Sequence, residues 1–131
     1  ILCELLPGLD AGNRRRRDIA AVYDDGLRDC PVIRPVVPAG AEHAFHQYVI
    51  RVPARQALRD GLRERGVETV VHYPLPVHRQ PAYAAFAEGA DLAVTERIAH
   101  DILSLPMFPA LTPEQTTRVV LAVRSVLGMP A

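Results

Sequence analysis

The stretch HQYVIRVPARQALRDGLRERGVETVVH, residues 46–72, changes its hydrophobic period twice. Residues 46–52 are rich in β-forming side chains and are followed by a proline, which predicts a strand. In residues 54–65 the apolar side chains recur at helical spacing, and Gly66 is a natural C-cap, which predicts a helix. Residues 67–72 return to β-forming side chains. We therefore predict a strand–helix–strand unit and an α/β fold, a small sheet with helices packed on it.

The segments on either side of this unit extend the prediction. Residues 2–28 show helical spacing of apolar and small side chains, with a proline that either kinks the helix or begins its second half. Prolines punctuate residues 32–37, which predicts a short strand at a sheet edge. Residues 92–103 again have helical spacing, and residues 104–109 are apolar and read as extended.

The last helix has the clearest boundaries. Thr112 is the predicted N-cap, Pro113 occupies the first helical position, and Gln115 completes a capping box. Gly128 ends the helix. The buried face is predicted to consist of Val119, Val120, Val123, Val126 and Leu127.

The bulk composition excludes several classes of protein. The chain has 131 residues, 49% of them hydrophobic, and a formal net charge of zero. Zero net charge gives no electrostatic case for binding nucleic acid or an anionic membrane. No apolar run approaches the roughly 18 residues of a membrane span, and no secretory leader is recognisable. We therefore expect a cytoplasmic protein, with Cys3 and Cys30 reduced.

Two features of the chain are unusual. It lacks an initiator methionine and opens in a helical pattern, with Leu2, Leu5, Leu6 and Leu9 on one face. We expect this face to pack against polypeptide that precedes residue 1. The chain also contains fifteen basic residues that are all arginine, with no lysine. Without a side-chain primary amine it cannot form an internal Schiff base with a cofactor or a carbonyl substrate.

The segment HYPLPVHRQPAY, residues 72–83, has more histidine and tyrosine side chains than any other stretch of equal length in the chain. Its prolines fix backbone angles and remove donors, which predicts a stiff, extended loop. The loop follows a strand end and carries the rings of His72, Tyr73, His78 and Tyr83. These rings could form hydrogen bonds with a phosphate or a sugar, or stack on a planar group. On residue chemistry alone, a binding site and a well-packed connection remain equally open.

The sequence gives little support for a metal site, a catalytic serine or a phosphate-binding loop. His43 and His46 lie three residues apart, which on a strand directs them to opposite faces, and the chain has no HExxH or CxxC motif. We expect no metal site. No serine lies in a GxSxG turn, and neither GxGxxG nor GxxxxGK[ST] occurs. The basic run at residues 14–17 reads as a solvated helix face, with a phosphate-binding patch as the alternative.

Ordered motifs cover almost the whole chain. They are Leu-Pro-x-Leu-Asp-x-x-Asn-x-x-Arg-Arg at 6–17, His-Ala-Phe-His-Gln-Tyr-Val-Ile-Arg-Val at 43–52, His-Tyr-Pro-x-Pro-x-His-x-Gln-Pro-x-Tyr at 72–83, Thr-Glu-Arg-Ile-Ala at 95–99, and Leu-Ser-Leu-Pro-Met-Phe-Pro at 103–109. In this order they resemble the small C-terminal domain of DegT/StrS-type nucleotide-sugar aminotransferases, which have the aspartate-aminotransferase fold (fold type I).

The resemblance implies a pyridoxal 5'-phosphate-dependent enzyme. Such enzymes transfer an amino group from glutamate or glutamine to a keto-sugar linked to a nucleoside diphosphate, and they work as homodimers. The resemblance places the catalytic lysine and most cofactor contacts in a large domain outside this chain, so no catalytic residue is assigned here and the chain alone is expected to be inactive. It implies that His72, Tyr73 and His78 help to bind the substrate.

The resemblance also implies a division of the chain. Residues 1–28 would be a linking helix toward the large domain, and residues 29–131 the small α/β domain. The segment from Phe86 to Ala93 departs from the family pattern, because it keeps only Gly-Ala-Asp at 89–91 and has alanine where proline is common. Two alternatives remain open, a standalone non-catalytic α/β module and a sugar dehydratase of the same fold with histidine in place of the lysine.

Overall fold

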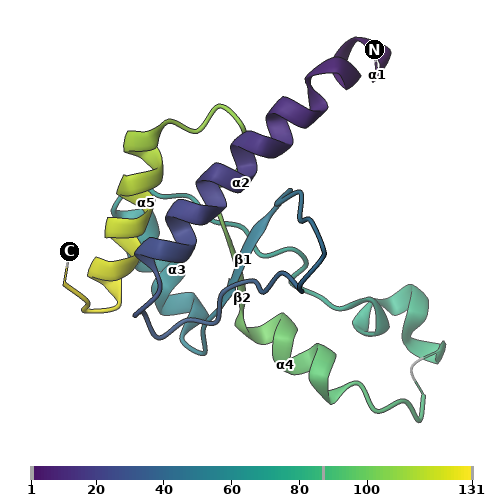
Figure 1. Ribbon diagram of the computed structural model, residues 1–131. Helices are drawn as coiled ribbons and strands as arrows, with labels where there is room; N and C mark the ends of the chain where they lie inside the picture. The colour runs from purple at the N-terminus through teal and green to yellow at the C-terminus, as the bar shows by residue number, and fades with distance from the viewer. Residues whose placement is uncertain (1, 87, 131) are drawn as a thin grey trace.

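The computed structural model describes residues 2–86 and 88–130. Two short strands, β1 (Tyr48–Arg51) and β2 (Ile102–Leu105), form an antiparallel sheet between helices (Figure 1). The α-helices are α1 (Leu2–Leu5), α2 (Leu9–Gly26), α3 (Arg55–Glu64), α4 (Ala93–Asp101) and α5 (Pro113–Val126). Single turns of 3-10 helix occur at Leu6–Gly8 and Val77–Arg79, and a longer one at Pro81–Phe86. The α/β fold class is thereby confirmed.

The sheet is smaller than the sequence predicts. Tyr48 pairs with Leu105 and Ile50 with Leu103, and all four side chains are buried. The predicted strands at 32–37 and 67–72 are each reduced to one antiparallel bridge, Ile33 with Arg51 and Val70 with Ser104. Pro31, Pro35 and Pro38 interrupt the first segment and Pro74 follows the second, and because prolines cannot donate to a ladder, pairing stops after one bridge.

The helices agree closely with the sequence, apart from the end of one. Around Pro7 the first helix is interrupted by the 3-10 turn before α2 begins. The predicted helix at 92–103 ends at Asp101, because residues 102–105 are taken up by pairing with β1. The capping box of α5 is confirmed: the Thr112 hydroxyl accepts from the Gln115 backbone N–H at 3.2 Å, and the Gln115 side chain accepts from the Thr112 N–H at 2.9 Å.

The core lies between the sheet and helices α2, α3 and α5. Helix α5 contacts both α2 and α3. The largest fully buried side chains come from these three helices, the residue after α2 and both strands, and they include Tyr23, Leu27, Tyr48, Ile50, Leu58, Leu62, Leu103 and Val123. This burial fixes β2, and the bridge of Val70 to Ser104 of β2 fixes the point from which the loop at 72–83 leaves the sheet.

Two glycines allow the helices to approach closely. A Cβ atom built on Gly26, at the end of α2, would lie 2.5 Å from Val120 Cγ1 of α5, and one on Gly61 of α3 would lie 2.8 Å from Val126 Cγ1. Real Cβ atoms essentially never approach another atom so closely. The contact of α5 with both helices therefore depends on the missing side chain at these positions.

Replacing Gly26 by Ala should destabilise the protein. The overlap with Val120 costs about 1–3 kcal/mol, which exceeds the gain in helix propensity of up to about 1 kcal/mol. Gly12→Ala in the same helix is the matched control, because its Cβ would meet only ordinary contacts at 3.5 Å. Urea unfolding should show a lower midpoint for Gly26→Ala and an unchanged or higher one for Gly12→Ala. Equal midpoints for the two variants would contradict this packing argument.

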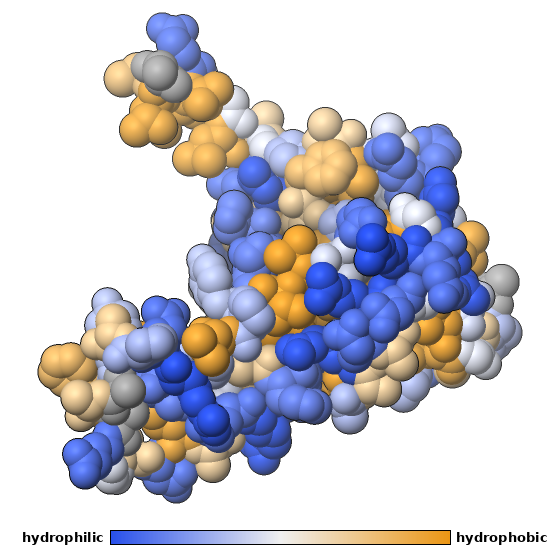
Figure 2. All heavy atoms as spheres, turned by 180° about the vertical axis from the view of Figure 1, so that it is seen from behind, coloured by the Kyte–Doolittle hydropathy of each residue, from blue (hydrophilic) through white to orange (hydrophobic). Residues whose placement is uncertain are grey.

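Two parts of the molecule project from the core. The N-terminal end, from α1 into α2, extends on one side, and the segment from Tyr73 to α4 extends on another (Figure 1). Figure 2 shows a broad hollow between these two projections, with apolar side chains prominent on the N-terminal one. Among the described residues, no helix is both long enough and apolar enough to cross a bilayer.

Candidate functional site

The loop at 72–83 forms one wall of a large cavity with a mostly apolar lining. The cavity has a volume of about 810 Å³. Instead of the predicted extended course, the loop folds into the 3-10 turns at Val77–Arg79 and Pro81–Phe86. Helix α4 and the start of β2 supply the opposite wall. The lining side chains are mostly apolar or aromatic, and they include Leu75, Val77, Tyr83, Phe86, Leu92, Ile98 and Ile102.

Two of the three predicted substrate-binding residues line this cavity. Tyr73 lines it with 75% of its surface exposed, and the side chain of His78 lines it while only 15% exposed. His72 lies elsewhere: its Nδ1 is 3.0 Å from the Ser104 hydroxyl of β2, and its ring stands edge-on to that of Tyr73 at 6.0 Å. The structure thus brings Tyr73 and His78 together, with His72 supporting the loop from the sheet.

A carboxylate that the sequence did not predict to be functional bonds to one of these two residues. Oε1 of Glu96, in the first turn of α4, lies 3.0 Å from His78 Nε2 and 2.9 Å from Arg79 Nε. The hydrogen bond from His78, then that from Arg79, lowers the pKa of Glu96 below its usual range. The sequence signal for Glu96 is the Thr-Glu-Arg-Ile-Ala motif at 95–99, but only the folded chain shows that its partner is His78.

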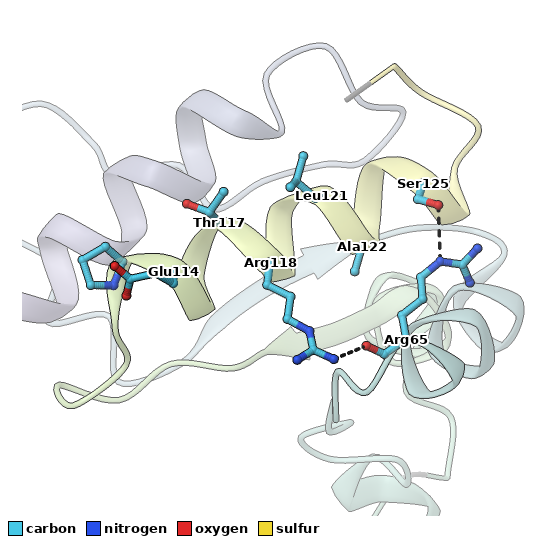
Figure 3. Close-up of a pocket in the computed structure, with 8 residues that line it drawn as sticks. Arg65, Glu114, Thr117, Arg118, Leu121, Ala122 and Ser125 are labelled. Carbon is cyan, nitrogen blue, oxygen red and sulfur yellow. Dashed lines mark hydrogen bonds between the residues drawn. The ribbon is translucent and has the colours of Figure 1, made fainter.

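A second cavity, of about 640 Å³, lies along α5 beside the end of α3 (Figure 3). Arg65 donates to the Ser125 hydroxyl at 3.3 Å, and Arg118 donates to the Arg65 carbonyl at 2.9 Å. These bonds attach the end of α3 to α5. Leu121 and Ala122 also line the cavity. Because both guanidinium groups are engaged within the fold, we assign this cavity a structural role.

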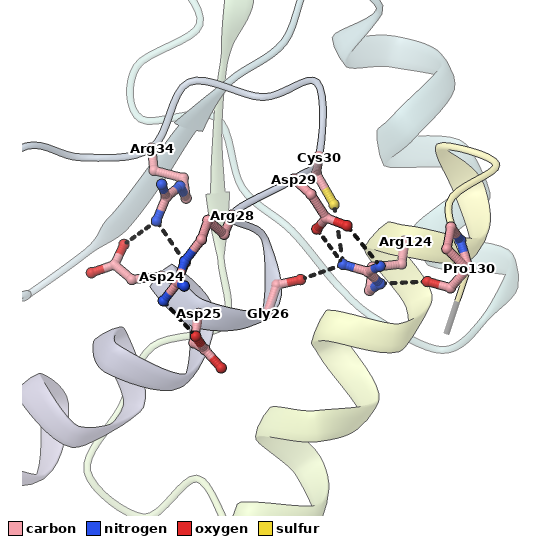
Figure 4. Close-up of polar contacts among 9 residues, drawn as sticks. All are labelled: Asp24, Asp25, Gly26, Arg28, Asp29, Cys30, Arg34, Arg124 and Pro130. Atoms are coloured by element: carbon pink, nitrogen blue, oxygen red, sulfur yellow. Dashed lines mark hydrogen bonds and ion pairs between the residues drawn. The ribbon is translucent and has the colours of Figure 1, made fainter.

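The densest polar cluster is also structural (Figure 4). Arg124 of α5 donates to both carboxylate oxygens of Asp29, at 2.6 and 3.2 Å, and to the carbonyls of Gly26 and Pro130. Hydrogen bonding to Arg124 lowers the pKa of Asp29, and the pKa of Arg124 is raised in turn. Arg124 thereby satisfies the carboxyl end of α2 and joins it to α5.

The remaining nucleophiles and metal ligands are poorly placed for chemistry. Both cysteines are free; Cys3 is exposed and Cys30 is buried. Burial raises the pKa of the Cys30 thiol, which disfavours the reactive thiolate. Within residues 2–86 and 88–130, no group of three or more His, Cys, Asp or Glu side chains is arranged to hold a metal ion.

Comparison with known proteins gives a consistent result. The sequence profile of the DegT/DnrJ/EryC1/StrS aminotransferase family matches residues 1–124. The chain is 43% identical over 125 residues to the pleiotropic regulatory protein of Geobacillus stearothermophilus, covering 92% of this chain and 33% of that protein. It is also 43% identical over 122 residues to dTDP-3-amino-3,4,6-trideoxy-alpha-D-glucose transaminase of Streptomyces venezuelae, covering 91% and 32%.

The fold is shared with solved structures at similar coverage. The crystal structure of S. venezuelae DesV superposes with a TM-score of 0.89 at 40% identity, covering 96% of this chain and 34% of that one. The chain therefore spans about a third of the length of the relatives that it matches.

Proposed function

The chain belongs to the DegT/DnrJ/EryC1/StrS aminotransferase family, and we propose that the complete protein transfers an amino group from glutamate or glutamine to a nucleotide-linked keto-sugar. The observation that carries this proposal is the 43% identity to a dTDP-sugar transaminase over 91% of the chain. The cavity between the 72–83 loop and α4, bordered by Tyr73 and His78, is the part of the substrate site that these residues would supply.

The family implies pyridoxal 5'-phosphate as the cofactor. When bound, this group supplies the electron sink for amino-group transfer. The chain has no lysine, so its residues do not fit a role as the covalent anchor. They do fit a role as one wall of a shared site, because the cavity offers aromatic faces and only a few polar groups. We place the anchor in polypeptide outside residues 1–131.

The shape of the chain supports this division. Leu2, Leu5 and Leu6 are 82%, 66% and 66% exposed, and they belong to α1 and the 3-10 turn after it, on the N-terminal projection (Figure 1). Exposed apolar patches of this kind mark interaction sites. We propose that residues 1–28 link to a larger domain that covers this face, and that residues 29–131 form the smaller domain. The homodimer and the cytoplasmic location are parts of the same proposal.

Borohydride trapping tests where the covalent anchor lies. The purified 131-residue chain, mixed with pyridoxal phosphate and reduced, should give no labelled side-chain amine by peptide mass spectrometry and no transamination. The complete protein should be labelled on one lysine and should convert a nucleotide-linked keto-sugar with glutamate. Transamination by the 131-residue chain would overturn the proposal, and so would an unlabelled, inactive complete protein.

A further inference from the structure

The hydrogen bonds around Glu96 define the state of the His78 ring. Both His78 Nε2 and the Arg79 guanidinium bond to the same carboxylate oxygen, Oε1, and Arg79 Nη2 lies 2.7 Å from it. The side chain of His78 is far less exposed than that of Glu96, at 15% against 42%. Glu96 is therefore held from the solvent side by Arg79 while it contacts a mostly buried imidazole.

The chemistry of these groups fixes the proton on the imidazole. An ionised carboxylate can only accept hydrogen bonds, so Nε2 of His78 must be the donor. The other nitrogen, Nδ1, has no hydrogen-bond partner within the described part of the chain. In the neutral ring Nδ1 is then an acceptor, and it is the nitrogen left for a ligand in the cavity that His78 lines.

We propose that Glu96 is a positioning residue, which orients His78 and holds its proton on Nε2 so that Nδ1 accepts a hydrogen bond from a hydroxyl group of the sugar. This inference rests on the proposed function, because it takes a hydroxylated ligand in the cavity. Glu96 itself does not line this cavity but a neighbouring one, together with Arg55 and His100, so it acts through His78 and not by touching this ligand.

A double-mutant cycle in the complete protein tests the inference. Glu96→Ala and His78→Ala should each raise KM for a nucleotide-linked keto-sugar about fivefold, the effect of about one hydrogen bond, with kcat little changed. The double variant should be no worse than His78→Ala alone, because Glu96 acts only through that ring. Arg79→Ala is the matched control: it removes the other partner of Oε1, leaves the bond from His78, and should change KM less than Glu96→Ala. Additive effects of Glu96→Ala and His78→Ala would overturn the inference.

A spectroscopic measurement separates this inference from the proposed function. In the complete protein with ¹⁵N-labelled histidine and no substrate, the His78 signals should show the proton on Nε2 alone. Glu96→Ala should give a mixture of the two neutral forms, and Arg79→Ala should not. If this pattern is seen while His78→Ala leaves KM unchanged, the positioning role stands and the proposed substrate contact fails. An unchanged ring spectrum in Glu96→Ala would refute the positioning role, whatever the kinetics.

Discussion

Replacing Tyr73 by Ala in the complete protein should lower kcat/KM for the sugar nucleotide by about 10–100-fold, equivalent to about 1.4–2.8 kcal/mol of lost interaction. Tyr73 is 75% exposed and borders the cavity, so in this chain its side chain has few contacts to lose. A ring that is exposed in the protein can gain contacts only from a ligand or from another part of the complete enzyme. Steady-state kinetics with the nucleotide-linked keto-sugar measures the effect.

Two controls separate binding from packing at this position. Because Tyr73 is on the surface, Tyr73→Ala should change the free energy of unfolding by no more than about 0.5 kcal/mol, and the cofactor absorbance should persist. Tyr73→Phe keeps the flat ring and should retain most of the activity. Unchanged kinetics in Tyr73→Ala would favour the interpretation of residues 72–83 as a well-packed connection.

The helices of this fold could be read from the sequence because their signals are local. Helix α3 was predicted at 54–65 and lies at Arg55–Glu64, and the capping box of α5 uses the two residues expected. Capping, periodicity and C-terminal glycine all act within a few residues of each other. No contact with a distant part of the chain was needed to place them.

The strands were harder because their partners are distant in sequence. Pairing of β1 with β2 joins residues more than fifty positions apart, and this pairing took Ile102 and Leu103 out of the predicted helix. The segment at 67–72 has good β-forming residues, yet it makes a single bridge before the proline-rich loop begins. The β-propensity of these residues predicts an extended backbone, but it does not predict how many hydrogen-bonded pairs the segment forms with a neighbouring strand.

The residues of the candidate site could likewise be predicted from the sequence only in part. The types and spacing of Tyr73 and His78 drew attention to them, and both line the cavity. The hydrogen bond of His72 to Ser104 spans 32 residues and that of His78 to Glu96 spans 18. Each bond joins two separate parts of the fold, and local periodicity does not predict such contacts, so the sequence alone did not separate the ring that supports the loop from the rings that face the cavity.

Tyr23→Ala should destabilise the protein more than Gly26→Ala or Tyr73→Ala, with a loss of about 3–5 kcal/mol in the free energy of unfolding. Tyr23 is fully buried on α2, and its ring stands edge-on to that of Tyr48 on β1 at 5.0 Å. Its hydroxyl donates to the Pro106 carbonyl, just after β2, at 2.7 Å. One side chain therefore joins α2 to both strands. Urea unfolding of the 131-residue chain, followed by far-UV circular dichroism, measures the loss.

The variant Tyr23→Phe divides this effect into its two parts. Burial raises the pKa of Tyr23 well above its usual range, so the hydroxyl stays a protonated donor at neutral pH. Removing only that donor should cost about 1–2 kcal/mol, since the Pro106 carbonyl loses its partner while the ring remains packed. The rest of the loss in Tyr23→Ala then belongs to the ring and the cavity that it leaves. If Tyr23→Phe were as unstable as Tyr23→Ala, the hydrogen bond to Pro106 and not aromatic packing would be what attaches α2 to the sheet.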